Sequence, residues 1–237
     1  MYQFQWEEES MPVIAIDGPS GAGKSSVSRA IAERFGWSYL DTGALYRAVT
    51  FFALENGIST LDELPGRLAD AKLHWNGNPQ NPEISLAGRV INSEIRSAEV
   101  TAQVSLVAAN PAVRIFLLGM QREIINNSWP GIVVEGRDIG TTVWPDAELK
   151  IFLTADLQAR AVRRSAELQA NLSDSDVERS LAARDRIDST RDFSPLRQTE
   201  DQIVLDATHL SFNEVVSEII DIIGELKLAN DDGKHGR

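Results

Sequence analysis

Residues 18–25, GPSGAGKS, are the first group in the sequence whose types and spacing predict chemistry. They match G-x-x-x-x-G-K-[ST], a pattern in which glycines let backbone N–H groups curl around an anion. Lys24 supplies a cation for the β- and γ-phosphates of a nucleoside triphosphate, and the Ser25 hydroxyl can ligate Mg²⁺. The alternative is a flexible Gly/Ser loop before a helix. The predicted triphosphate-binding residues are Gly18, Pro19, Ser20, Gly21, Ala22, Gly23, Lys24, Ser25 and Ser26.

A second chemical feature lies at residues 131–142, GIVVEGRDIGTT, where an apolar run ends on two opposite charges. Arg137 and Asp138 directly follow residues that are typical of a buried strand. One interpretation is a surface ion pair, which contributes little to stability. The other is that both side chains lie at the mouth of a site and hold a ligand. This stretch alone leaves both interpretations open.

Arginine dominates the basic residues and is unevenly distributed. Of the 23 basic residues 18 are arginine, and eight of these lie between Arg160 and Arg197, together with seven acids. Arginine suits forked recognition of phosphate, so this segment favours a small phosphorylated ligand. The alternative is a solvated helical face with i,i+4 charge pairs. The net charge of −12 argues against general nucleic-acid binding, which depends on neutralising phosphates.

The composition narrows the class of protein. The chain has 237 residues, 43% of them hydrophobic and 24% charged, which fits one large α/β domain or one with inserted subdomains. It has no cysteine, which excludes disulfides and thiolate metal sites, and its three histidines are scattered. The first ten residues do not resemble a signal peptide, and no run approaches the roughly 18 apolar residues of a membrane span. We therefore expect a soluble cytoplasmic protein without a membrane partner.

Five apolar runs alternate with helical patterns and predict the elements that position these motifs. Val27, Ala30, Ile31 and Phe35 recur at helical spacing after the loop, and Gly36 is placed to end that helix. The alternation predicts an α/β fold: a P-loop parallel sheet with helices on both faces, binding ligands beyond the carboxyl ends of its strands. The predicted strands are 12–17, 37–41, 132–135, 149–155 and 202–208, with a second helix over 43–56.

Two stretches interrupt the alternation. Residues 57–110 hold short strand-like pieces with turn signals and predict a small inserted antiparallel sheet. Residues 156–200 are helical, charged and rich in arginine, with a bend expected at 172–177. The P-loop core is then 12–56, 111–155 and 201–228, while disorder is expected in an extension, 1–11, and a tail, 229–237.

The triphosphate-binding loop suits several classes of protein, which need different further motifs. A switch GTPase needs N/T-K-x-D, and none of the five lysines has Asp two places on. The D-E pair and signature loops of a transport or motor ATPase are not evident either. A small-molecule kinase needs a second site for the phosphate acceptor and a cover that excludes water. The arginine-rich residues 156–200 are suited to form that cover, here termed the lid.

Three more motifs give the chain a specific resemblance to one family. With DTGALYR (41–47), EGRDIG (135–140) and RDRIDSTRDFSPL (184–196) added to the P-loop, the sequence resembles the bacterial cytidylate (CMP/dCMP) kinases of the nucleoside monophosphate kinase group. The match covers about residues 12–228. The insert at 57–110 also resembles that family and is absent from shorter relatives such as adenylate kinases. The resemblance implies a monomer that binds ATP with Mg²⁺, and CMP or dCMP.

The resemblance also implies a role for each motif residue. Arg47 and Arg137 hold the acceptor's phosphate, while Thr42 and Arg114 recognise cytosine, although Thr42 is equally suited to cap a helix and Arg114 to lie on a helix surface. Asp188 and Arg191 are lid residues for the ribose and phosphates, and Arg184 is a lid candidate for the transferring phosphoryl group. The implied CMP-binding residues are Thr42, Tyr46, Arg47, Arg114, Arg137, Asp138, Asp188 and Arg191, and the catalytic residues are Lys24, Arg137, Arg184 and Arg191.

Asp138 carries the most discriminating of these implied roles, contact with the cytosine amino group. Cytosine N4 is a hydrogen-bond donor that a carboxylate can accept, whereas uracil presents an acceptor at that place. An aspartate there therefore favours cytosine, because leaving a buried polar group unpaired is costly. The alternative is that Asp138 pairs with Arg137 or with another arginine.

Some assignments stay open. Asp17, directly before the loop, can orient the waters of Mg²⁺ or cap the P-loop backbone, and Arg160 and Arg163 can lie near the donor or in solvent. The expected reaction is transfer of the γ-phosphoryl group from Mg·ATP to CMP or dCMP. The alternatives are a UMP/CMP-type kinase of broader range and a non-catalytic P-loop regulator.

Overall fold

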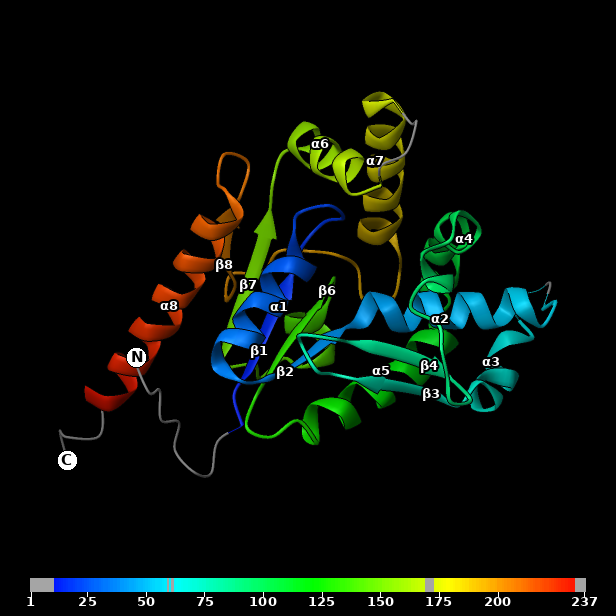
Figure 1. Cartoon of the computed structure of the whole chain (residues 1–237), viewed down its shortest axis with the longest axis horizontal. Coiled ribbons are helices and arrows are strands. Elements are labelled where there is room, and N and C mark those ends of the chain that lie inside the picture. Colours follow the sequence, from blue (N-terminus) through cyan, green and yellow to red (C-terminus); the bar gives the residue numbers. More distant parts are fainter. Residues whose placement is uncertain (1–10, 59, 61, 169–172, 233–237) are drawn as a thin grey trace.

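A computed structural model describes residues 11–58, 60, 62–168 and 173–232 of the chain. Its centre is a five-stranded sheet in the order β2-β6-β1-β7-β8, in which all neighbours are parallel (Figure 1). The strands are β1 (Val13–Asp17), β2 (Ser38–Asp41), β6 (Ile132–Gly136), β7 (Leu149–Thr154) and β8 (Ile203–Asp206). The α/β fold with a parallel sheet, predicted from the alternating apolar runs, is confirmed.

The central strands are apolar except for Asp17 and Glu135 near their carboxyl ends, because their neighbours and the covering helices bury both faces. All five residues of β1 and all five of β6 are buried. The register pairs Asp17 with Gly136, and Asp41 with Glu135. Since the strands are parallel, these polar residues meet at one edge of the sheet, at its carboxyl ends.

The helices that flank this sheet begin and end at residues with recognisable caps. Gly36 ends α1 (Lys24–Phe35) in the left-handed conformation, φ 69°, as its position in the sequence predicted. Asp41 begins α2 (Thr42–Glu55) by accepting a hydrogen bond from Ala44 N at 3.0 Å, and Asn110 caps α5 (Pro111–Asn126) in the same way.

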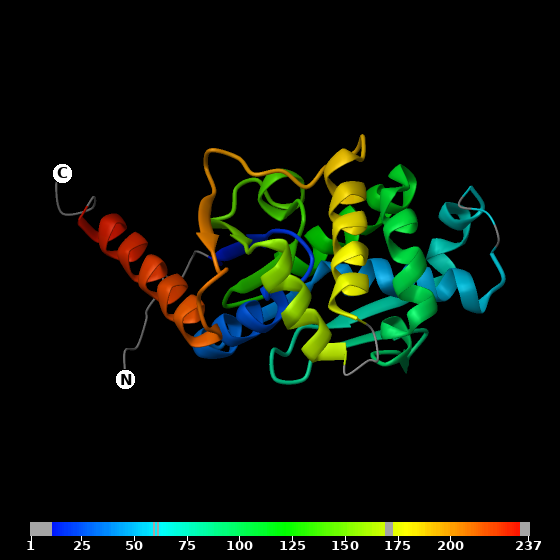
Figure 2. The ribbon, with the colours of Figure 1, turned by 90° about the horizontal axis from the view of Figure 1, so that it is seen from above.

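The last helix, α8 (Phe212–Asp232), packs against α1 (Figures 1 and 2). It continues through residues 229–232, which were predicted to be disordered. The physical reason is that 225–232, ELKLANDD, holds no proline or glycine, and Gly233 is the first residue that interrupts the pattern. The rest of the predicted tail, 233–237, and residues 1–10 of the predicted extension lie outside the described residues.

The insert is only partly the predicted sheet. Its three antiparallel strands are β3 (Leu73–Asn76), β4 (Glu83–Leu86) and β5 (Arg89–Val90). The other elements are helical: α3 (Leu64–Arg67), η1 (Leu68–Ala71), η2 (Glu94–Arg96) and α4 (Ala98–Ala109). The sequence signal for α4 is a Ser97 cap followed by buried Val100, Val104 and Val107 at helical spacing. Of the described helices none alone could cross a membrane; α4 and α5 pass that test only together, bent by 93°.

Trp75 anchors the insert to the edge of the parallel sheet. Its indole N–H donates to the carbonyl of Tyr39 in β2 at 2.7 Å, and Tyr39 N donates to Gly77 O at 2.9 Å. These bonds satisfy backbone groups of an edge strand that would otherwise face solvent. The Trp75 ring is buried and meets the Tyr39 ring edge-on at 6.0 Å. The insert therefore packs against the parallel sheet through specific hydrogen bonds and a ring contact.

Replacing Trp75 by alanine is expected to lower the free energy of unfolding by about 3–5 kcal/mol, because it leaves a cavity and an unpaired carbonyl. Urea unfolding followed by circular dichroism measures this change. The matched control is Trp129→Ala, because Trp129 is 63% exposed and its removal leaves no buried cavity. Equal losses in both variants would show that Trp75 is not an anchor.

The lid consists of two helices packed on each other, α6 (Leu157–Leu168) and α7 (Asp174–Thr190). They share a small apolar cluster of Ala161, Val177 and Leu181. Ser173 caps α7, so the bend predicted at 172–177 is a helix start from residue 173 on, while residue 172 lies outside the described part. Seen from above, α6 lies over the P-loop and α7 lies beside α6 (Figure 2).

Candidate active site

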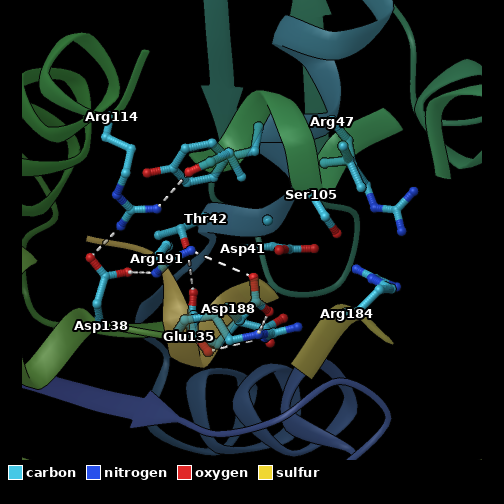
Figure 3. Close-up of a pocket in the computed structure, with 16 residues that line it drawn as sticks. Asp41, Thr42, Arg47, Ser105, Arg114, Glu135, Asp138, Arg184, Asp188 and Arg191 are labelled. Atoms are coloured by element: carbon cyan, nitrogen blue, oxygen red, sulfur yellow. Dashed lines mark hydrogen bonds and ion pairs between the residues drawn. The ribbon is translucent and has the colours of Figure 1, made fainter. Parts of the chain in front are cut away.

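A pocket opens at the carboxyl ends of β2 and β6 and is closed by elements from four other parts of the chain (Figure 3). The start of α2, the insert helix α4, the start of α5 and the lid helix α7 each contribute a wall. The structure brings together all eight residues that the family resemblance implied for the acceptor. The lining residues are Asp41, Thr42, Gly43, Tyr46, Arg47, Val104, Ser105, Ala108, Arg114, Glu135, Gly136, Arg137, Asp138, Arg184, Asp188 and Arg191.

One end of the pocket holds a buried carboxylate between two arginines. Asp138 Oδ2 accepts from Arg114 Nη2 at 2.5 Å, and its Oδ1 lies 3.5 Å from Arg191 Nη2. Arg114 also donates to Ala108 O at 3.1 Å and lies over the Tyr46 ring, 5.3 Å from its centre. Arg114 is 3% exposed and therefore not a surface residue. Asp138 pairs with other arginines, as one alternative held, but its partner is not Arg137.

Arg137 has a different partner, the lid. Its Nε donates to Asp188 Oδ2 at 2.7 Å, and Nη1 donates to Gly136 O at 3.2 Å. Although burial opposes it, the charge of Arg137 lowers the pKa of Asp188, so this carboxylate stays ionised. The adjacent Arg137 and Asp138 thus point to different partners, and neither forms the surface ion pair considered from sequence.

The other end of the pocket gathers positive charge. Burial, and then the nearby Arg184, lower the pKa of Arg47 to about 10; burial, and then Arg137, do the same for Arg184. The Nε of Arg184 is buried and has no hydrogen-bond partner among the described residues. Guanidinium groups brought this close favour an anion between them. The two side chains lie together away from Asp138 (Figure 3).

Arg164 of α6 adds to this positive charge, and sequence reasoning missed it. It lies close enough to lower the pKa of both Arg47 and Arg184. The available signal was its place in the arginine-rich lid, but helical spacing does not say which of several arginines lies near Arg47 and Arg184. Arg163, one residue earlier, instead donates to the backbone carbonyls of Ala207 and Leu210.

Thr42 and Arg47 are held by neighbours from different parts of the chain. The Thr42 hydroxyl donates to Glu135 O at 2.8 Å, and the residue that caps α2 is Asp41. The alternative in which Thr42 caps this helix is therefore wrong. Arg47 Nη1 donates to Ile95 O at 3.1 Å and to Thr101 Oγ1 at 3.0 Å, both in the insert. The insert therefore orients an arginine of the pocket as well as forming one of its walls.

The P-loop lies beside this pocket and keeps Lys24 buried. Lys24 Nζ donates to Pro19 O at 2.8 Å, within the loop itself. Gly18 has φ 147°, and a Cβ there would lie 2.0 Å from Leu153 O, so only glycine fits. Burial, and then Arg137, lower the pKa of Lys24 to about 7. The ammonium thus lacks a nearby counter-ion strong enough to offset its desolvation.

The pKa of Lys24 predicts that triphosphate binding at pH 8 takes up a proton. Above pH 7 the lysine is mostly neutral in the empty loop, and bound phosphates raise its pKa, so the ammonium forms on binding. Calorimetry in two buffers of different ionisation enthalpy measures the protons exchanged. The Lys24→Met variant should lack this uptake, and equal uptake in both proteins would contradict the assignment.

Two carboxylates near the ends of strands, Glu135 of β6 and Asp41 of β2, were also missed from sequence. Glu135, at the end of β6, accepts from Tyr39 OH at 2.6 Å, and burial followed by Asp41 raises its pKa to about 7; Ser25 also hydrogen-bonds to it. Both acids end parallel strands, which is where such sheets bind ligands. Oxygen donors of this kind suit Mg²⁺, which uses one or two carboxylates with substrate phosphates. The described residues include no group of three or more acidic, histidine or cysteine side chains placed to hold a metal ion.

Asp17 caps a backbone segment other than the P-loop. Its Oδ1 accepts from Ile139 N at 2.7 Å, and its Oδ2 accepts from Gly140 N at 2.9 Å and from Gln202 Nε2 at 3.2 Å. The backbone that it caps is therefore the turn after β6 and not the P-loop. Burial raises the pKa of Asp17 to about 6.

The lid touches the P-loop through Arg160 and Asp185. Ser20 N donates to Asp185 Oδ1 at 3.1 Å, while Arg160 Nη1 donates to Ser20 O at 2.9 Å and pairs with Asp185 Oδ2. Arg160 is 7% exposed, so of its two predicted locations the one near the donor loop is correct. Asp185 lies in the lid motif but was not singled out from the sequence.

Comparison with known proteins identifies the family. The family model described as cytidylate kinase matches residues 14–225. The chain belongs to the cytidylate kinase family. It is 47% identical over 216 residues to a cytidylate kinase of Streptomyces coelicolor, covering 90% of this chain and 93% of the relative. A cytidylate kinase of a Geobacillus species is 45% identical over 217 residues, covering 90% and 96%.

Another relative is matched over only part of its length. The bifunctional pantoate ligase/cytidylate kinase of Trichodesmium erythraeum is 44% identical over 217 residues, and the match spans 89% of this chain but 40% of that protein. Among solved structures, an uncharacterised protein of Eubacterium ventriosum has a TM-score of 0.51 at 12% identity, covering 90% of this chain and 99% of its own. That likeness supports the fold alone.

Proposed function

We propose that this protein transfers the γ-phosphoryl group of Mg·ATP to CMP or dCMP, giving CDP or dCDP and ADP. The observation that carries the proposal is the polarity of the pocket, with a buried carboxylate, Asp138, at one end and clustered arginines at the other. A nucleoside monophosphate has complementary ends, a base with polar edge groups and a phosphate of nearly two negative charges. The names of the family and of its relatives, cytidylate kinase, support the same acceptor.

Asp138 is the proposed reader of the base. A carboxylate has about four lone-pair sites, and the hydrogen bond from Arg114 uses one of them. Arg191 Nη2, at 3.5 Å, forms an ion pair with Asp138 without a hydrogen bond, so sites remain for the amino group of cytosine. The two arginines keep the carboxylate in place, and Tyr46 supports Arg114 through its ring. Uracil would bring its O4 acceptor against the same oxygen and be rejected.

Phosphoryl transfer then depends on positioning and charge neutralisation. An oxygen of the acceptor phosphate attacks the γ-phosphorus in line, the bond to the β,γ-bridging oxygen breaks, and ADP leaves. No general base is needed, because the second pKa of a phosphate monoester is about 6 and the acceptor is mostly dianionic at pH 7. Arg47, Arg137 and Arg184 neutralise the acceptor and the transferring group, and Lys24 neutralises the donor.

Ser25 and Glu135 are the residues that would hold Mg²⁺, through the hydroxyl and the carboxylate that hydrogen-bond to each other. A bound ion would supply charge neutralisation to the donor phosphates. The lid excludes water, which would otherwise hydrolyse the donor. The monomeric state and cytoplasmic location implied earlier stay predictions.

A coupled assay of ADP release with CMP, dCMP, UMP and AMP tests the proposal. The expected result is that CMP and dCMP turn over well ahead of UMP, with AMP slowest. Comparable rates for UMP and CMP would support the broader-range alternative, and turnover of AMP ahead of CMP would contradict the proposal. A protein that binds ATP but transfers nothing would be the non-catalytic regulator.

A further inference from the structure

Asp17 is a fully buried ionisable residue outside the acceptor pocket. It is 0% exposed, and three hydrogen bonds reach its two oxygens. Two of the donors are backbone N–H groups, of Ile139 and Gly140, and these directly follow Arg137 and Asp138. The Asp17 carboxylate therefore binds the backbone N–H group of the residue that directly follows Asp138, the proposed base reader.

The capped segment is a short turn with an unusual hydrogen-bond pattern. η3 (Ile139–Val143) is a π-type turn in which Thr142 N and Val143 N both donate to Asp138 O, at 2.9 and 3.1 Å. The first N–H groups of any helical turn have no partner within it. Asp17 supplies that partner from another strand, so the orientation of the Asp138 backbone depends on β1.

The third bond extends this connection to the return of the lid. Gln202 Nε2 donates to Asp17 Oδ2, and Gln202 Oε1 accepts from Thr199 N at 3.0 Å. Thr199 lies between the lid residue Arg191 and β8. Gly18, the first residue of the P-loop, follows Asp17 in the chain. One carboxylate thus connects the start of the donor loop, the base-reading turn and the chain leaving the lid.

Gly140 allows this close approach. A Cβ at Gly140 would lie 3.1 Å from Lys150 Cδ and 3.5 Å from Asp17 Oδ2. The turn at Gly140 is therefore packed between Lys150 and Asp17. A shift of the Asp17 carboxylate is therefore expected to move the backbone of this turn. Waters bound to Mg²⁺ would compete with three existing donors for the oxygens of Asp17. The observed contacts therefore favour a role of Asp17 in holding the turn after β6.

We propose that Asp17 is a positioning residue for base recognition, holding the 138–140 segment in register with the P-loop, and not a residue of the Mg²⁺ site. The proposal rests on the proposed function, because it assigns base reading to Asp138. It predicts that Asp17 acts on CMP and on the cytosine preference, although it belongs to the donor side of the chain.

Asp17→Asn is the sharpest test, because it preserves the shape of the side chain but replaces one acceptor oxygen by an N–H₂ donor. If the remaining oxygen faces Gly140 N and Gln202 Nε2, the amide N–H₂ opposes Ile139 N–H, and two donors then repel. We expect KM for CMP to rise about tenfold or more and the CMP:UMP ratio of kcat/KM to fall by about the same factor, as small misplacements do. KM for ATP and the Mg²⁺ concentration for half-maximal rate should stay unchanged.

Gln202→Leu is the milder variant should Asp17→Asn fail to fold. It removes one of the three bonds, and a smaller change in the same direction is expected. Asp206→Asn is the matched control, since this aspartate ends β8 at the surface and bonds only locally to Thr208 in the described contacts. It should leave all four quantities unchanged.

The alternative outcomes are distinct. A shift in the Mg²⁺ requirement with an unchanged KM for CMP would assign Asp17 to the metal and overturn the proposal. A lower melting temperature with unchanged CMP:UMP discrimination would reduce Asp17 to a stabilising residue and also overturn it. Absence of CMP phosphorylation by the unaltered protein would instead contradict the proposed function, so the two failures are separable.

Discussion

Replacing Asp138 by asparagine is expected to abolish the preference for cytosine over uracil. The carboxylate would become an amide whose N–H₂ opposes the amino group of cytosine and can donate to O4 of uracil. We expect kcat/KM for CMP to fall about 100-fold or more, because a site built around a hydrogen bond rejects a ligand that cannot form it. The kcat/KM for UMP should fall much less. The coupled assay with both nucleotides measures the ratio.

The fold should survive this change in a weakened form. Arg114 is buried and would lose its charged partner while keeping its bond to Ala108 O and its contact with Tyr46. Deleting one partner of a buried ion pair costs about 3–5 kcal/mol, and the asparagine oxygen should recover part of this. Asp192→Asn in the exposed part of the lid region is the matched control and should change neither quantity. An unaltered CMP:UMP ratio in the Asp138 variant would remove Asp138 from the role of base reader.

Replacing Lys24 by methionine is expected to lower kcat about 1,000-fold while the protein stays folded. In the proposed function the Lys24 ammonium neutralises the donor phosphates, and removing one preorganised group of this kind costs about 100- to 1,000-fold in kcat. Because Lys24 is 5% exposed and its pKa is lowered by burial, methionine removes a buried charge at little structural cost. The melting temperature should be unchanged or higher.

The control for Lys24 is Lys72→Met, since Lys72 is an exposed lysine of the insert, far along the chain from the P-loop. It should keep both kcat and melting temperature. A Lys24→Met protein that retains more than a tenth of the kcat would contradict the role of Lys24. A protein that loses kcat because it unfolds would show a lower melting temperature, which separates the two effects.

Much of the fold could be predicted because its signals are local in the chain. The P-loop is eight consecutive residues, the end of α1 depends on one glycine, and the strands of the parallel sheet are short apolar runs. The insert was harder, because β3, β4 and β5 alternate with turns while α4 carries a weaker helical pattern. The tail was misjudged because α8 continues on helix-forming residues to Asp232.

The residues of the candidate site could likewise be predicted only where the signal is local in the chain. The motifs identified most residues that line the pocket, because each motif is a continuous stretch placed at the end of a strand or on one face of a helix. They did not identify Glu135, Asp41, Arg164 or Asp185 as contributors. Glu135, Arg164 and Asp185 act through neighbours that are distant in the chain, which no local pattern reveals. Asp41 has a local role as the cap of α2, and this role does not predict its effect on Glu135.

The sequence by itself determined that a triphosphate-binding loop precedes a helix, that the sheet is parallel, and that arginines supply the positive charge. Only the tertiary structure decided which charges meet. Arg137 and Asp138 are adjacent, yet their partners lie 51 residues away in Asp188 and 24 residues away in Arg114. Asp17 reaches Ile139 across 122 residues. The physical reason is that Coulomb and hydrogen-bond energies depend on separation in space, which parallel strands and packed helices set independently of separation in the chain.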